Sequence, residues 1–128
     1  MNYREIQQDV IKKYRVTINE NSKCWDRMHV HTRSRMICKW HPKNSIQATF
    51  DLLHEIGHLE NNKSGMRRAE EEYYATVWAL EQCEKYRITV PKKTWKRYQD
   101  YVDMEKARGI RRGGKAYGEL RLPTKAVR

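Results

Sequence analysis

The sequence lacks any long apolar run and contains only three cysteines. Because a membrane span needs roughly 20 consecutive apolar residues, we expect no transmembrane helix. The opening stretch MNYREIQQDVIKKY has no apolar core, so we expect no signal peptide. The cysteines form no CxxC pair, which argues against a disulfide framework and predicts a reducing cytoplasm. Internal repeats and low-complexity tracts are also missing.

Apolar residues are scarce as well, at 38% of the 128 residues, whereas 34% are charged. This composition predicts a small core, to which a bound metal would add stability. The four tryptophans and eight tyrosines argue against a disordered chain, and we expect the tryptophans to pack in the core rather than stack on bases.

The charge is strongly basic overall, at +11, but unevenly distributed. The net charge is +6 over residues 1–44, −3 over 45–90 and +8 over 91–128. The basic flanks are either solvated faces or contacts to an acidic partner, such as nucleic acid, an acidic protein or anionic lipid. A module that only binds nucleic acid needs no acidic centre, so the middle segment invites a separate explanation.

Apolar spacing predicts four amphipathic helices, over residues 3–14, from Asn44 or Ser45 to 60, over 67–86, and from Pro91 onward. The fourth helix is expected to bury four residues: Trp95, Tyr98, Tyr101 and Val102. From Gly109 the pattern dissolves, which indicates a flexible arm or a long ordered extension.

Residues 24–40 alternate in polarity and predict an antiparallel hairpin that turns at residues 32–34. The expected fold is therefore α+β, mainly helical, with a small antiparallel sheet. The stretch HVHTR at the hairpin edge could pair with an extended peptide.

The segment LLHEIGHLE, residues 52–60, contains the candidate metal ligands and a candidate catalytic residue. In a helix, His54 and His58 lie about 40° apart in azimuth and roughly 6 Å apart along the axis, so both imidazoles can reach one tetrahedral ion. Glu55 then lies beside that ion, where it can act as a general base, and Gly57 leaves room for a neighbouring segment. The alternative is an ordinary helix that contains two histidines.

A third ligand is expected from the next helix, RRAEEEYYATVWALE. Glu70, Glu71 and Glu72 are all candidates, although acidic residues also suit a helix N-terminus. Glu72 shares a stripe with Ala75 and Ala79, small residues that let two helices approach closely. This placement favours Glu72.

LLHEIGHLE followed by EYYATVWA resembles the ImmA/IrrE-type zinc metallopeptidase domain of phages and mobile elements. That family, a gluzincin type, follows its HExxH helix with an E-x-x-A-N/D-x-F/W-A pattern, matched here by Glu72, Ala75, Trp78 and Ala79. The resemblance implies a Zn²⁺ ion held by His54, His58 and Glu72, with Glu55 as catalytic base. Thr76 replaces the family's Asn or Asp, which steadies a ligand histidine, so this support is left open.

The resemblance implies a metallopeptidase-like domain over residues 1–90, followed by a basic C-terminal helix and Gly/Arg-rich extension over 91–128. It implies hydrolysis of a peptide bond in a protein or peptide substrate. We see no helix-turn-helix region like that of some family members. The alternative function is a basic nucleic-acid-binding or protein-inhibitory module that uses the zinc domain only as a scaffold. Candidate oxyanion donors are Tyr73, Tyr74, Tyr98 and Tyr101.

A second, structural zinc site could involve Cys24, His29, His31, Cys38 and His41. We favour a simpler interpretation for this region, with Cys38 as a small buried residue and both strand histidines on the solvent face. Cys83 is expected in the core.

Overall fold

The computed structural model describes residues 1–20, 28–61, 63 and 65–128. Its elements are α1 (Tyr3–Lys13), β1 (Thr17–Asn19), β2 (His29–His31), β3 (Met36–Cys38), α2 (Ile46–Glu60), α3 (Arg68–Lys85) and α4 (Lys92–Arg111). The predicted α+β, mainly helical class is confirmed. None of the helices in these described ranges is both long and apolar enough to cross a membrane.

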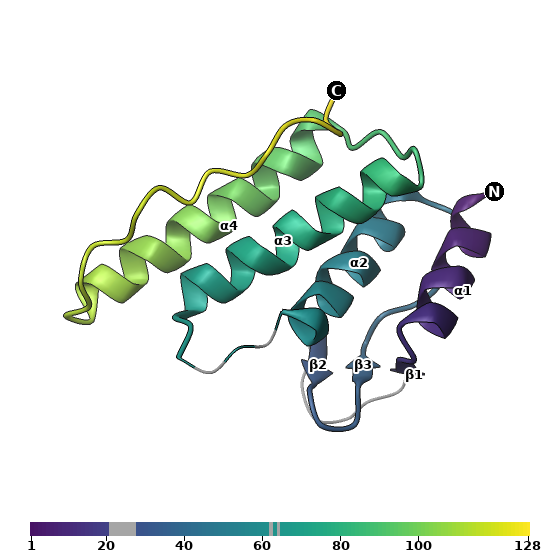
Figure 1. Cartoon of the computed structure of the whole chain (residues 1–128), viewed down its shortest axis with the longest axis horizontal. Helices are drawn as coiled ribbons and strands as arrows, with labels where there is room; N and C mark the ends of the chain where they lie inside the picture. The colour runs from purple at the N-terminus through teal and green to yellow at the C-terminus, as the bar shows by residue number, and fades with distance from the viewer. Residues whose placement is uncertain (21–27, 62, 64) are drawn as a thin grey trace.

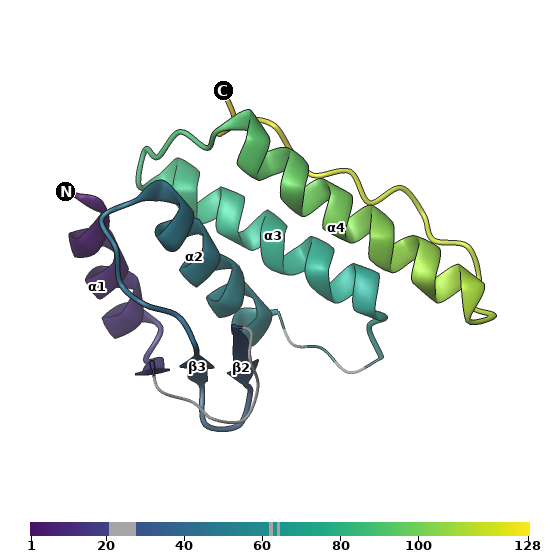
Figure 2. The ribbon, with the colours of Figure 1, turned by 180° about the vertical axis from the view of Figure 1, so that it is seen from behind.

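The four helices lie side by side in chain order, and the small sheet lies at one end of α1 and α2 (Figures 1 and 2). Helix α2 begins where predicted, because the Ser45 hydroxyl accepts a hydrogen bond from the backbone N–H of Ala48 at 3.2 Å. Its apolar face is completely buried at Phe50, Leu53 and Ile56. The helix that carries the HEIGH motif is therefore the central element of the core.

The sheet has the strand order β1-β3-β2, so β2 is an edge strand. Strands β2 and β3 form the predicted antiparallel hairpin, although residues 24–27 of that prediction lie outside the described residues. Strand β1 adds a parallel partner to β3 that the sequence did not indicate. Three residues, TIN, are too few to display an alternating pattern.

The sheet turns one row of apolar side chains, Ile18, Ile37 and Val30, toward the core. The prediction that His29 faces solvent is wrong, because its side chain is only 6% exposed. His31, two residues further along the same strand, is exposed as predicted.

The buried side of α4 differs from the prediction. Val102 is fully buried, but Trp95, Tyr98 and Tyr101 are only partly buried. Two polar residues are instead almost completely buried on this helix: Gln99 is 3% exposed and Glu105 is 4% exposed. The periodicity of apolar residues alone cannot reveal such a face.

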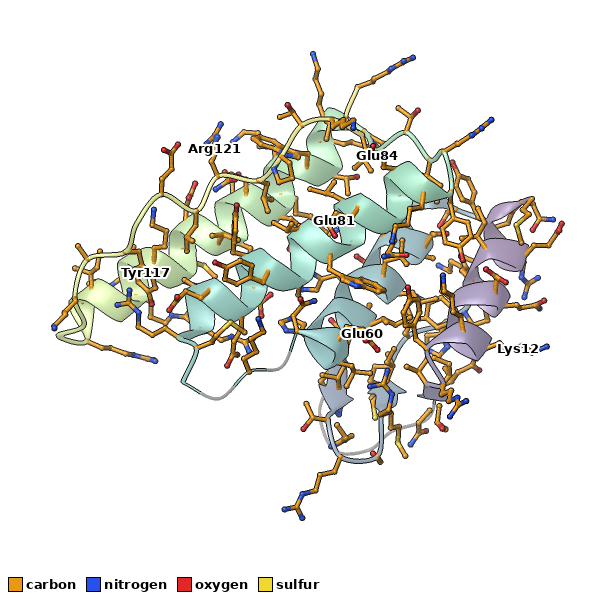
Figure 3. All side chains as sticks on the ribbon, viewed as in Figure 1. Lys12, Glu60, Glu81, Glu84, Tyr117 and Arg121 are labelled. Carbon is orange, nitrogen blue, oxygen red and sulfur yellow. The ribbon has the colours of Figure 1, made fainter. Side chains whose placement is uncertain are left out.

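The chain after α4 is an ordered extension that runs back along the helix (Figure 1). Tyr117 and Arg121 mark its course (Figure 3). The Gln99 side chain holds this C-terminal extension, donating to the Leu120 carbonyl at 3.1 Å and accepting from the Leu122 N–H at 2.8 Å. The division into domains at residue 90 stays a prediction.

Candidate metal centre

Three potential ligands from two helices converge on one point between α2 and α3. The Nε2 atom of His54 lies 3.0 Å from Glu72 Oε2 and 3.1 Å from His58 Nε2. The His58 Nε2 atom lies 3.3 Å from Glu72 Oε1. His54 and Glu72 are buried, at 5% and 2% exposed, and His58 is partly buried. The structure thus brings together the three residues that the sequence analysis selected as ligands.

The two helices approach closely because small residues meet between them. A Cβ atom placed on Gly57 would lie 2.4 Å from the Ala75 carbonyl oxygen, a distance that real side chains do not tolerate. Ala75 and Ala79 are both completely buried on the facing side of α3. This contact lets the short Glu72 side chain reach the imidazoles of α2.

The other two glutamates of the EEE run have other partners. Glu70 accepts a hydrogen bond from the Arg67 backbone N–H at 3.2 Å and so satisfies the N-terminus of α3. Glu71 lies 3.9 Å from the guanidinium of Arg68. The helix-terminus explanation therefore accounts for these two, and Glu72 alone of the three contacts the histidines.

Thr76 orients the first histidine. Its hydroxyl donates to the Glu72 backbone carbonyl at 2.8 Å, and its oxygen lies 3.0 Å from His54 Nδ1. Since the hydroxyl proton is already donated, the oxygen accepts from Nδ1–H of His54, and this contact turns the Nε2 atom of the ring toward Glu72 and His58. Thr76 therefore supplies the support that its replacement of Asn or Asp left open.

The protonation states follow from these contacts. Burial raises the pKa of the Glu72 carboxyl, but hydrogen bonds with His54 and His58 outweigh burial and hold the pKa well below its ordinary value. Burial lowers the pKa of His58, yet its hydrogen bond with Glu72 raises it above the ordinary value overall. Without a cation between them, the carboxylate and a protonated His58 neutralise each other.

Glu55 lies at the same centre with a different environment. Burial raises the pKa of its carboxyl, and the nearby imidazoles of His54 and His58 only partly offset this rise. Within the described part of the chain, its carboxylate is engaged in no hydrogen bond or ion pair. A carboxylate with a raised pKa and no fixed partner suits the transfer of a proton.

A cleft of about 870 Å³ opens onto the centre, lined by residues of β2, α2, the start of α3 and α4. The Tyr98 ring lies 4.8 Å from the His54 ring, and its hydroxyl donates to Asp51. The hydroxyl of Tyr101 accepts from Arg68 at 3.4 Å. Tyr73, whose hydroxyl donates to the Arg121 carbonyl, does not line the cleft.

Four arginines of the cleft were missed by the sequence analysis. Arg68 lies 3.0 Å from the Glu72 carboxylate, and Arg108 lies 3.0 Å from the buried Glu105. Arg97 and Arg112 line the cleft without an ion pair inside the described ranges. Arg97 and Arg108 of α4 and the C-cap residue Arg112 are spaced by eleven and four residues, which is a helical spacing that the sequence displays.

The donor set fits a divalent cation. Zinc binds imidazole nitrogen and carboxylate oxygen at about 2.0–2.2 Å, and a tetrahedron of that size has edges of about 3.3 Å. The two imidazole nitrogens lie 3.1 Å apart, and each lies 3.0 or 3.3 Å from one of the two Glu72 oxygens, so small side-chain rotations bring one nitrogen from each ring and one oxygen to such edges. Three protein ligands leave a fourth position free, which is typical of catalytic rather than structural zinc.

The structure also places Cys83 and the described cysteine and histidines of the second predicted zinc set. Cys83 is completely buried, and burial raises its thiol pKa to about 12. Of the second predicted zinc set, His29, His31 and Cys38 lie close together, whereas His41 lies 4.0 Å from Glu20 and outside that group. Cys24 lies outside the described residues.

Comparison with known proteins adds no further information on identity. No protein-family model, curated protein or solved structure matches the chain. The resemblance to the ImmA/IrrE type stays a prediction drawn from the motifs.

Proposed function

We propose that the protein is a zinc-dependent metalloendopeptidase, of the ImmA/IrrE-like gluzincin type, that acts in a reducing cytoplasm and is encoded by a phage or mobile element. The observation that carries the proposal is the convergence of His54, His58 and Glu72 within 3.3 Å of one another beside the unengaged carboxylate of Glu55. A structural site would not need this carboxylate.

In the proposed reaction, His54, His58 and Glu72 bind the metal and Glu55 transfers the proton. His54, His58 and Glu72 would hold a Zn²⁺ ion, which would supply a water that is activated near neutral pH and a Lewis acid for the peptide carbonyl. Glu55 takes the proton of the attacking water and passes it to the leaving amine. Because burial raises its carboxyl pKa, Glu55 accepts a proton more readily than an exposed glutamate does.

The developing oxyanion needs a hydrogen-bond donor, and Tyr101 is the best-placed tyrosine. Tyr98 already donates its only hydroxyl proton to Asp51. The Tyr101 oxygen instead accepts from Arg68, so its own proton is left for the substrate. Tyr73 and Tyr74 do not line the cleft. We therefore assign Tyr101 to this role.

The substrate is proposed to be an extended peptide with acidic residues. Strand β2 is the edge of the sheet and borders the cleft, so a peptide can add to it as a further strand. Arg97 and Arg112 also line the cleft, and their charges have no ion-pair partner in the described chain. Uncompensated cations in a cleft favour substrates with carboxylates.

The alternative function is a basic module that binds nucleic acid or an acidic protein, with the zinc domain as scaffold. It is favoured by the exposed lysines and arginines of α4 and the C-terminal extension. Such contacts are also compatible with a peptidase that is recruited to a DNA-bound substrate.

The decisive experiment compares the zinc-loaded protein with Glu55→Gln on internally quenched peptides rich in Asp and Glu. We expect the wild type to cleave and the variant to lose at least about 100-fold in rate while it keeps its zinc. Equal rates in both proteins would contradict the proposal. Zinc retention without cleavage in the wild type would favour the scaffold function.

A further inference from the structure

A second group of potential metal ligands lies on the sheet, outside the HEIGH centre. In the antiparallel register His29 is paired with Cys38, and His31 follows two residues later on the same strand. Side chains two residues apart in a strand share a face, and directly paired residues do so as well. His29, His31 and Cys38 therefore lie on the face opposite to the apolar row of Ile37.

The ligand atoms of these three side chains are close to one another. One ring nitrogen from each histidine and the Cys38 sulfur all lie within 4.8 Å of one another. The two imidazole rings are 5.0 Å apart between centroids and nearly perpendicular, with an interplanar angle of 83°. Three different ligand atoms at this spacing can close on one ion by small side-chain rotations.

Burial distinguishes this group from a random surface cluster. The Cys38 side chain is 1% exposed and His29 is 6% exposed, although neither faces the apolar core row. His31 is exposed and gives solvent access to the group. The group therefore combines a buried thiol and a buried imidazole with one exposed imidazole, which leaves one side open for a cation to enter.

We propose that His29, His31 and Cys38 form a second metal site that binds a thiophilic cation, Zn²⁺ in the first instance. One thiolate with two imidazoles is a donor set that zinc prefers, whereas Mg²⁺ and Ca²⁺ require oxygen ligands. The set differs from the centre on α2 and α3, which offers nitrogen and oxygen only. The site is independent of peptidase activity.

A cation here joins β2 to β3 at the pair His29 and Cys38. Strand β2 is short, pairs with β3 alone among the described strands, and borders the cleft of the first centre. A metal that ties it to β3 stabilises the edge against which a peptide would lie. The expected role of the second ion is therefore to stabilise this strand.

The two proposed metal sites can be distinguished by experiment, because the site on the sheet contains a cysteine and the HEIGH centre does not. The metal-free full-length protein is titrated with Co²⁺ under anaerobic reducing conditions, and near-ultraviolet absorption from thiolate-to-cobalt charge transfer is recorded. The HEIGH centre contains no sulfur, so this absorption cannot come from that centre. We expect it in the wild type, in His58→Ala and in Cys83→Ser, which removes a cysteine buried elsewhere.

Two variants test the assignment. Cys38→Ser should abolish the absorption, and His31→Ala should lower the Co²⁺ affinity at least about tenfold. Because His31 is exposed, its replacement should leave the circular dichroism unchanged even if Cys38→Ser fails to fold. Absence of the absorption in the wild type would overturn the proposal. So would its persistence in Cys38→Ser, or an unchanged affinity in His31→Ala.

Discussion

Gly57 of α2 lies against the backbone of Ala75 in α3, so that an added Cβ would come within 2.4 Å of the Ala75 carbonyl oxygen. This contact sets the separation of the two helices that carry the ligands. The geometry of the centre thus depends on a residue that contributes no ligand atom.

Gly57→Ala should weaken the centre without touching a ligand. The extra methyl pushes α2 and α3 apart, which costs about 1–3 kcal/mol of folding stability and withdraws Glu72 from the imidazoles. We expect a lower Tm and a zinc affinity reduced at least about tenfold, measured by competition with a chromophoric chelator. The matched control is Gly118→Ala, because nothing lies within 4 Å of a Cβ at Gly118. Equal zinc affinity in both variants would count against the role of this contact.

Thr76→Val should reduce zinc affinity by about 10- to 100-fold, because the isosteric side chain can no longer accept from His54 Nδ1–H. Thr76→Ser keeps the hydroxyl and should retain most of the affinity. The same chelator competition measures both variants. If valine and serine behave alike, the hydrogen bond does not orient the histidine.

Zinc affinity should fall as the pH is lowered, with His58 as the main cause. In the metal-free protein the pKa of His58 lies above its ordinary value, owing chiefly to the hydrogen bond with Glu72. Above that raised pKa the ring is neutral and ready to bind. Below it, each further pH unit should lower the apparent affinity about tenfold, because the cation must displace a proton.

Calorimetric titration near pH 6.5 in two buffers of different ionisation enthalpy counts this proton. We expect about one proton released per zinc from His58. The stability of the metal-free protein should change in the opposite direction, since its charged His58–Glu72 pair is lost as the pH rises through the raised pKa. His41→Gln, a change far from the centre, should leave the proton count unchanged. A count near zero would contradict the protonated pair.

Reversing charge in the cleft should change substrate preference. Arg97→Glu with Arg112→Glu is expected to lower kcat/KM for Asp- and Glu-rich peptides at least about tenfold and to improve cleavage of Lys-rich ones. Lys92→Glu with Lys93→Glu changes the net charge equally, at exposed positions that do not line the cleft. Similar effects from both pairs would mean that overall charge, rather than the cleft wall, selects the substrate.

The helices could be predicted because their signals are local. The cap at Ser45, the break after residue 60 and the apolar spacing of α2 are all visible in the sequence. The convergence on Glu72 was also predictable, since Ala75 and Ala79 indicate a close helix contact. These features depend on neighbours within a few turns of one helix.

The parts that could not be predicted depend on contacts between distant segments. The amide of Gln99 is buried because it binds the backbone of residues 120 and 122, more than 20 positions away. For the same reason, the C-terminal extension is part of the packed structure, with Leu122 only 2% exposed. A deletion of residues 109–128 would therefore alter the fold as well as the charge. Substitution of exposed lysines and arginines is the better test of nucleic-acid binding.

The proposed function depends on one divalent cation held by His54, His58 and Glu72. Its most direct test is elemental analysis of zinc bound to the purified Cys38→Ser protein, which isolates this centre from the sheet site, beside the same protein carrying His54→Ala. We expect about one zinc per chain in the first protein and nearly none in the second. Equal zinc content in the two proteins would contradict it.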